Sequence, residues 1–413
     1  MPRPRRPELH PRLAESRRRA GLTQEEVADR IGATVEMVRR HERGISMPSK
    51  VYRQRYGLLY GATQAELGLQ SGASQGSIAI PTGITSNIAD QSQVTGNPPA
   101  LLTAPIWTPE YADADYLAAT HAHIGQIIAL DNRFGGADLA KLAERSFRAL
   151  HNLLGTGSYE PSIEKDLLAV TGELAEVVGW LSYDADRQGT VRRMNQESLY
   201  FTRLAGDKKM ELLTLQNASM HAGFLNRPRE ALHIADSVLN GGYRLSPRLR
   251  TLFITRKARA LAQGGDDSSL QMFKEIRSLY LDGVQQTDPA WTWWVDEREL
   301  AWHEAMAKQD LGDSKSAIVQ FERSLEAASP AETRKQYTHR AYLLGAQVNL
   351  RSWNAVESTM QQLYPLAIEV ASTRTVVLLR KILRKIQTTE KRIPPGVLEE
   401  AEKLNLALDA APV

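Results

Sequence analysis

Residues that could carry acid–base or metal chemistry are scattered along the chain. His303 and Glu304 begin like the metalloprotease motif His-Glu-x-x-His, but the position four residues after His303 is an alanine. His121 and His123 stand two residues apart, so on a helix their side chains would point about 200° apart and would not share a metal ion. We therefore expect structural histidines, no bound metal and no catalytic residues.

Other candidate groups have simpler structural explanations. Asp184 and Asp186 are expected to serve a turn and a helix cap rather than paired acid chemistry. Trp291, Trp293 and Trp294 could form an aromatic box, although packing is the more common use of such a cluster. The sequence has neither a Gly-x-Gly-x-x-Gly run nor a Walker loop. We expect no cofactor and no enzymatic activity.

Composition sets the broad class of the protein. The chain has 413 residues, which favours two or more domains, and it contains no cysteine, which excludes disulfides and thiol chemistry. The charged N-terminal segment has no apolar run behind it, and no stretch of about 18 apolar residues occurs. These features predict a soluble, cytoplasmic protein without a membrane span.

The segment from Gly21 to Glu42 has the spacing of two short helices joined by a tight turn. Thr23 can cap the first helix, with Glu26 completing a capping box, and Gly32 can end it before Thr34 caps the second. The inward face of the pair is expected to carry Val27, Ala28, Ile31 and Val38. This pattern is typical of the helix-turn-helix unit, whose second helix enters a DNA major groove.

The neighbouring segments extend the pattern to five helical elements. Helices are expected over 8–19 and 49–59, followed by a short turn at 63–69. Residues 8–69 resemble a Cro/lambda-repressor-type (Xre) DNA-binding domain in the Gly-Leu-Thr-Gln entry, the Val-Ala pair of the first helix, and the Glu-Arg-Gly that precedes Pro48. The resemblance implies double-stranded DNA as a partner.

Charge agrees with this interpretation. Residues 1–70 hold 14 Lys and Arg against 8 Asp and Glu, whereas the whole chain holds 51 against 48. The net positive charge therefore lies in the N-terminal segment, where it would attract DNA phosphates.

The family pattern assigns DNA contacts residue by residue. The base-reading positions are Thr34, Val35, Glu36, Arg39 and Arg40. The phosphate-binding positions are Gln24, Arg43, Lys50 and Arg53. Arg40 could bond guanine, Glu36 could accept from cytosine, and Val35 could touch a thymine methyl. As alternatives, Glu36 and Arg40 could form an i, i+4 ion pair, and the other basic residues could be ordinary surface charge.

A compositional break follows the first domain. Between positions 69 and 107 the only charged residue is Asp90, which predicts a linker over 70–112 between a domain at 1–69 and a second at 113–413. Four isoleucines are too apolar for a fully solvated tether, so part of the linker is expected to dock. They are Ile78, Ile80, Ile84 and Ile88.

From about Asp113 onward, helical segments of roughly 15–20 residues alternate with Gly-, Asp- and Pro-containing breaks, which predicts antiparallel hairpins. One small or apolar position of each second helix sets a register at Val191, Ala231, Leu270, Ala317 and Ala355. The intervals of 40, 39, 47 and 38 residues exceed the tetratricopeptide period of about 34 and overlap the range of about 40–47 for HEAT-like units. We predict an all-α protein: a five-helix lambda-repressor-like domain followed by an α-solenoid of tetratricopeptide-like hairpins with long helices.

The layout resembles a group of actinobacterial transcriptional regulators, with landmarks at 130–136, 179–184 and 204–207. It is also similar to peptide-sensing repeat regulators of Gram-positive quorum systems, in which a peptide binds the concave face. By analogy, the inward positions of the first helices are candidate effector contacts. They include Glu176, Trp180, Gln216, Met220, Arg259, Glu299, Trp302 and Arg340. Alternatively, the tryptophans are core residues and the charges are solvated.

Together these patterns predict a DNA-binding transcriptional regulator. We expect a homodimer formed mainly by the repeat domain, because one Xre domain reads only a half-site. The repeat domain is expected to sense a peptide or small molecule. The alternative is a partner-binding scaffold that the DNA-binding domain merely localises.

Overall fold

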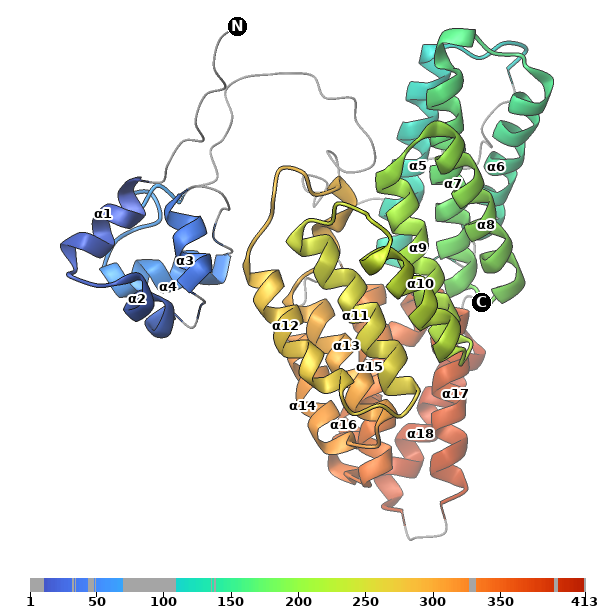
Figure 1. Cartoon of the computed structure of the whole chain (residues 1–413). Coiled ribbons are helices and arrows are strands. Elements are labelled where there is room, and N and C mark those ends of the chain that lie inside the picture. The colour runs from blue at the N-terminus through green and yellow to red at the C-terminus, as the bar shows by residue number, and fades with distance from the viewer. Residues whose placement is uncertain are drawn as a thin grey trace, which may run out of the picture.

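The computed structural model describes residues 11–31, 33, 35–43, 48, 50–69, 109–134, 136, 139–326, 332–389 and 393–411. Within these ranges the protein is helical, and its only extended pairing is an isolated bridge between Ala112 and Tyr159. Four short helices form an N-terminal domain, and longer helices form a stack (Figure 1). The fold class is all-α, as predicted. None of the described helices is long and apolar enough to cross a bilayer.

The N-terminal domain consists of α1 (Pro11–Arg19), α2 (Gln24–Ile31), α3 (Val35–Glu42) and α4 (Lys50–Tyr60). The predicted capping box is present: the Thr23 amide donates to Glu26 at 2.7 Å, and the Glu26 amide donates to Thr23 Oγ1 at 3.2 Å. The fifth expected element is a hydrogen-bonded turn, which Thr63 and Glu66 cap in the same way. Gly32 and Thr34, the expected stop and second cap, lie outside the described residues.

These four helices share one apolar core. The predicted inward face is buried, since Val27, Ala28, Ile31 and Val38 are all shielded from solvent. Leu13 of α1 and the rings of Tyr52 and Tyr56 from α4 complete the cluster. The domain is thus held by contacts between all its helices rather than by the motif alone.

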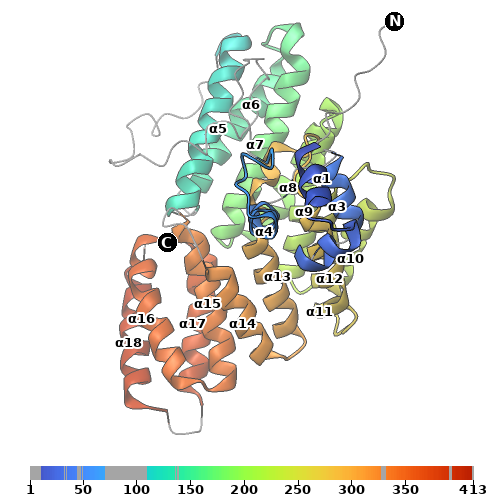
Figure 2. The same cartoon turned by 90° about the vertical axis from the view of Figure 1, so that its left-hand side faces the viewer.

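The second part of the chain is a series of hairpins whose first and second helices alternate. These helices are α5 (Ala114–Phe134), α6 (Leu139–Thr156), α7 (Glu164–Asp184), α8 (Gln188–Ala205), α9 (Lys208–Phe224), α10 (Pro228–Asn240), α11 (Pro247–Gln263), α12 (Ser269–Leu281), α13 (Glu297–Asp310), α14 (Ser314–Leu325), α15 (Thr333–Leu350), α16 (Trp353–Glu369), α17 (Thr373–Gln387) and α18 (Pro395–Asp409). Many of the breaks, such as those at Gly206, Gly241 and Gly264, fall where the glycine and proline signals predicted them. The breaks before α16 and α17 were not predicted, because residues 351–352 and 370–372 contain neither glycine nor proline. α16 and α18 stand side by side at the end of the stack (Figure 2).

The register of the second helices is partly as expected. Val191, Ala231 and Ala317 are buried in α8, α10 and α14. In α12 and α16 the buried positions are Ser269 and Val356, so the expected Leu270 and Ala355 were each wrong by one residue. The cause is packing: with Ser269 inward, Phe273 and Ile276 follow at i+4 and i+7 on the same face, and Lys274 stays exposed.

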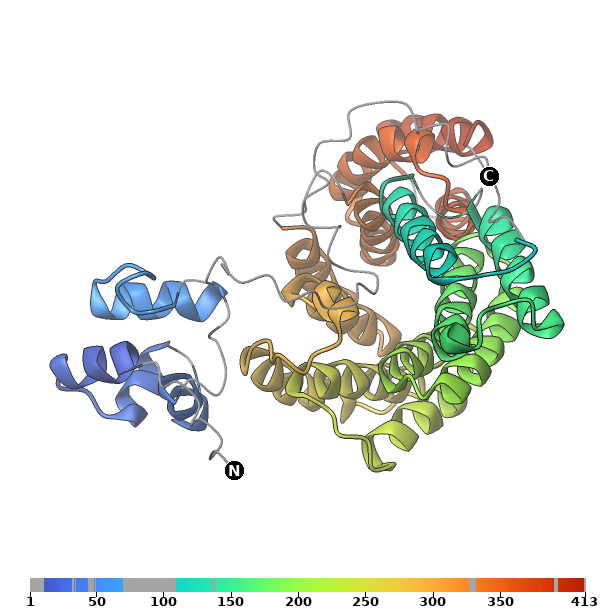
Figure 3. The ribbon, with the colours of Figure 1, turned by 90° about the horizontal axis from the view of Figure 1, so that it is seen from above.

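The stack curves until its two ends meet, as Figure 3 shows. The amide of Ala371, just before α17, donates to the carbonyl of Phe134 at the end of α5 at 2.8 Å. Four polar side chains pair across the same junction, which we call the seam: Asp131 with Arg334, and Asp184 with Arg374. Closure of the solenoid was not predicted, because contacts between residues 190 or more positions apart leave no local pattern in the sequence.

The expected linker lies mostly outside the described residues, including Ile78, Ile80, Ile84 and Ile88. Its last residues are placed: the amide of Ala112 donates to Ser158 at 3.0 Å, and the Glu160 amide donates back to Ala112 at 2.9 Å. This short pairing anchors the start of α5 on the turn that precedes α7.

Candidate functional site

The first helices of the hairpins carry a chain of buried polar contacts. Asn217 donates to Glu176, and Gln216, only 1% exposed, contacts Asn217 and accepts two hydrogen bonds from Arg256 at 3.1 and 2.7 Å. Burial raises the pKa of Glu176 to about 7. Two of the expected effector contacts, Glu176 and Gln216, are therefore close together, but they bond to the protein itself rather than line an open groove.

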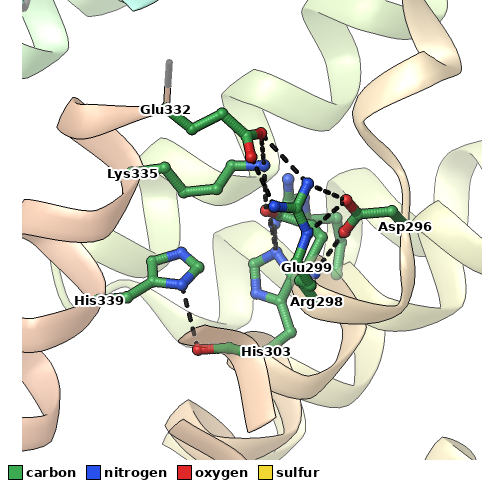
Figure 4. Close-up of polar contacts among 9 residues, drawn as sticks. Asp296, Arg298, Glu299, His303, Glu332, Lys335 and His339 are labelled. Carbon is green, nitrogen blue, oxygen red and sulfur yellow. Dashed lines mark hydrogen bonds and ion pairs between the residues drawn. The ribbon is translucent and has the colours of Figure 1, made fainter. Parts of the chain in front are cut away.

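The chain continues into α13. The Arg256 Nη1 atom lies 2.9 Å from Nε2 of His303, and the same imidazole nitrogen lies 3.1 Å from Glu299. Burial lowers the pKa of His303 to about 4, so the ring is neutral near pH 7. Although burial opposes it, the His303 hydrogen bond lowers the pKa of Glu299. Figure 4 shows Glu299 and His303 together with Lys335, whose ammonium lies 4.0 Å from Glu299.

A cluster of ion pairs between the N-terminal ends of α13 and α15 extends this chain of polar contacts. Arg298 binds Asp296 at 2.7 Å and also pairs with Glu332, which lies 3.5 Å from Lys335 (Figure 4). The sequence analysis missed this cluster, because its members come from separate helices and no short motif links them.

The other expected effector contacts have different surroundings. Trp302 stacks on His339 with ring centroids 5.1 Å apart. Arg259 pairs with Asp310 at 3.0 Å. Trp180 donates to Asp131 at 3.0 Å and so belongs to the seam.

The last two expected effector contacts, Met220 and Arg340, also lie outside the chain of buried polar contacts. Met220 is half-buried. Arg340 donates to Gln336 and Gln362 at 3.1 and 3.2 Å.

The residues considered for catalysis or metal binding also have structural partners. His121 lies 3.7 Å from Glu173, and His123 lies 3.1 Å from the Ser146 hydroxyl. No group of three or more metal-ligating side chains occurs in the part of the chain that the structure describes. Trp291 is buried and stacks on Trp294.

The expectation for Asp184 was wrong. This residue is neither a turn residue nor a cap but an anchor of the seam. Asp186 does lie in the turn after α7, with a φ of 56°.

In the N-terminal domain, the candidate phosphate ligand Gln24 belongs to a polar cluster. Arg17 holds Glu42 through two hydrogen bonds of 2.6 and 3.1 Å, and Gln24 donates to the same carboxylate at 2.8 Å. Arg39 donates to the Gln24 amide oxygen at 3.4 Å. The hydrogen bond with Glu42 raises the pKa of Arg17. Gln24 and Arg39 are thus positioned by residues of α1 and α3 that the sequence analysis did not single out.

The remaining candidate DNA contacts divide by exposure. Arg43 is exposed after α3, and Val35 is half-buried at its start. Arg53 donates to the carbonyl of Leu69 at 3.3 Å, so it also supports the last turn of the domain. Thr34 and the side chains of Glu36, Arg40 and Lys50 lie outside the described part of the chain.

With this geometry in place, comparison with protein families is informative. Residues 13–51 match the family described as Helix-turn-helix. Domains of this family bind DNA in transcription regulators. The match spans α1 to the start of α4 and includes every candidate DNA contact except Arg53. No curated protein and no solved structure matches the chain.

The helix-turn-helix match accounts for the arrangement of α2 and α3. The second helix of such a pair lies in the major groove and reads base edges with its N-terminal residues, while the first helix crosses the backbone. Gln24 is the first residue of α2, and the N-terminus of a helix generally favours an anion such as a phosphate.

Proposed function

We propose that the protein regulates transcription by binding a specific DNA sequence as a homodimer, and that its repeat domain senses an effector. The helix-turn-helix match at 13–51 carries the DNA-binding part of this proposal. In the proposed complex α3 reads bases through Thr34, Val35, Glu36, Arg39 and Arg40, while Gln24, Arg43, Lys50 and Arg53 hold the phosphates. One such domain reads only a half-site, so pairing across two half-sites would provide useful specificity.

Base reading can be tested with genomic fragments that the purified full-length protein selects. Arg40→Ala is expected to weaken binding to the selected sequence by about 1–3 kcal/mol and to weaken binding to random DNA less. An equal loss on both sequences would show that Arg40 contacts only phosphates. Sedimentation of the same protein, alone and with its site, tests the dimer; a monomer at micromolar concentration under both conditions would contradict it.

The buried polar interior supports the sensing part of the proposal. Polar groups from five successive first helices meet there, and buried polar groups need partners because burying them otherwise costs free energy. The competing function is a scaffold that binds a macromolecule without changing DNA affinity.

The two functions differ in one measurement, the DNA affinity with and without the small-molecule and peptide fraction of a cell extract. Sensing predicts a change in affinity that Gln216→Ala combined with Arg259→Ala abolishes, with basal DNA binding retained. An unchanged affinity together with capture of one protein partner would favour the scaffold.

A further inference from the structure

Five cationic or phenolic side chains lie on four of the first helices of the hairpins. They are Tyr183 of α7, Arg256 and Arg259 of α11, Tyr342 of α15, and Arg374 of α17. The guanidinium of Arg374 lies 4.5 Å from the centre of the Tyr183 ring. Burial raises the pKa of Tyr183 to about 12, with Arg374 and Arg256 opposing it. Arg259 is in turn close enough to both tyrosines for them to affect its pKa. The five groups therefore share one region.

The buried Arg256 has no direct ion pair among the described residues. It is 4% exposed, and among the described residues no carboxylate lies within ion-pair distance of it. Its contacts are the neutral amide of Gln216 and the neutral ring of His303. Glu299, which contacts the same nitrogen of His303, offsets the charge only in part, since burial lowers the pKa of Arg256 to about 10 although Glu299 opposes this shift. A buried charge that is only partly compensated is costly, because the protein interior solvates it poorly. The cost would fall if an anion occupied the interior.

The contact with His303 is itself incomplete. Nε2 of His303 can either accept from Arg256 or donate to Glu299, but a neutral ring nitrogen cannot do both. Whichever tautomer is present, one of these two neighbours lacks a matched hydrogen bond. An incoming oxyanion that accepts from Arg256 would leave His303 to donate to Glu299.

The two tyrosine hydroxyls add hydrogen-bond donors. No hydrogen bond of the Tyr183 or Tyr342 hydroxyl occurs among the residues that the structure describes, and neither hydroxyl is a fully buried atom, so both are accessible to a ligand. Arg259 and Arg374 each have one acidic partner, Asp310 at 3.0 Å and Asp184 at 3.3 Å. Guanidinium and hydroxyl donors around one region form an environment suited to a carboxylate or a phosphate.

Tyr342 also lines a pocket of about 250 Å³ between α13, α15 and α17. Its apolar wall consists of Val348, Leu378 and Ile382. Gly345 leaves room there, since a Cβ at this position would come within 3.3 Å of Ile382. The amide oxygen of Gln309, another lining residue, is buried without a hydrogen bond. The volume lies below the roughly 300–1,000 Å³ of sites for drug-sized ligands, which favours a small ligand over an extended peptide.

We propose that the interior of the solenoid binds a small amphipathic anion, with its carboxylate or phosphate group at Tyr183, Tyr342, Arg256 and Arg259 and its apolar body in the adjoining pocket. This inference rests on the proposed sensing function and specifies the effector class. It would also give Arg256 a directly bonded counter-charge, whereas Glu299 contacts His303 instead.

The test uses the full-length protein and three probes: hexanoate, inorganic phosphate, and the neutral control hexanamide. A ligand that binds only the folded state raises the melting temperature in a saturable manner. We expect hexanoate or phosphate, but not hexanamide, to do so. Tyr342→Phe and Arg259→Gln should each raise the dissociation constant by about tenfold or more, because each removes a donor to a charged acceptor. Arg380→Gln on α17, whose partner is the exposed Asp409, is the matched control and should bind as the wild type does.

Several outcomes would overturn the proposal. They are the absence of saturable stabilisation by both anions, equal stabilisation by hexanamide, and equal affinity in the wild type and the two site variants. A hexanoate response identifies the carboxylate class and a phosphate response identifies the phosphate class. DNA affinity measured with and without the anion distinguishes the anion site from the sensing function. If the anion binds but the DNA affinity does not change, the site is confirmed and sensing is refuted.

Discussion

Asp184, the last residue of α7, accepts a hydrogen bond at 3.3 Å from Arg374 in the first turn of α17, 190 positions later in the chain. The Ser372 hydroxyl donates to the same carboxylate oxygen at 2.8 Å, and all three residues are buried. The second pair of the seam joins Asp131 to Arg334, whose guanidinium lies 5.0 Å from the centre of the Trp180 ring. The ends of the solenoid are thus joined by ion pairs that are largely buried. Loss of one partner would leave the other charge buried and unpaired, which costs more free energy than loss of an apolar contact.

We predict that Asp184→Asn destabilises the repeat domain strongly. Breaking one side of a buried ion pair costs about 3–5 kcal/mol, because the remaining charge stays buried without its partner. The expected result is a lower melting temperature together with faster hydrogen exchange at the Ala371 amide, which bonds across the seam.

The control for this prediction is Arg380→Gln. Arg380 lies on α17, as Arg374 does, and the substitution removes an exposed ion pair with Asp409 of α18. Exposed pairs contribute about 0–1 kcal/mol, so little change is expected. If both variants melt alike, the seam does not hold the ring closed.

The sequence predicted the helices better than their closure. Turn signals such as Gly312 and Asn226 mark helix ends because local backbone conformation decides them, and both residues have positive φ. The capping box of Thr23 is local for the same reason. The pairs Asp184–Arg374 and Arg17–Glu42 depend on tertiary geometry, so no spacing along the chain indicates them. Of the expected inward positions, Glu176 of α7 and Gln216 of α9 belong to the observed polar chain. In α11 the expected position was Arg259, whereas the central residue of the chain is Arg256.

Glu173 should make stability depend on pH. Burial raises the pKa of this carboxyl to about 8, so the folded state favours its neutral form. Its contribution to stability is greatest below the unfolded pKa of about 4.3 and falls as the pH rises toward 8, because the folded state then holds a proton that the unfolded state has lost.

Glu173→Gln should therefore stabilise the protein relative to the wild type by an amount that grows from pH 5 to pH 8, reaching on the order of 2–4 kcal/mol. Melting curves across this range are the measurement. Glu164→Gln, an exposed change on the same helix, provides the control. A difference between Glu173→Gln and the wild type that does not vary with pH would contradict the prediction.

The capping box of α2 makes a local prediction. Thr23→Ala removes the hydroxyl that accepts from the Glu26 amide and should cost about 0.5–2 kcal/mol. Thr23→Ser keeps an oxygen in place and should restore most of the loss. Hydrogen exchange of the amides at 24–31 measures the effect directly, and equal protection in Thr23→Ala and Thr23→Ser would argue against a capping role.

The last prediction separates phosphate contacts from structural arginines in the helix-turn-helix domain. Arg43 is exposed, whereas Arg53 also bonds the carbonyl of Leu69. Arg43→Ala should weaken binding to specific and random DNA alike and reduce the slope of log affinity against log salt by about 0.9, the value for one phosphate contact. Arg53→Ala should in addition lower the melting temperature of the domain, since the Leu69 carbonyl loses its donor. An unchanged salt slope for Arg43→Ala would remove it from the interface, and an unchanged melting temperature for Arg53→Ala would mean that its bond to Leu69 contributes little to the fold.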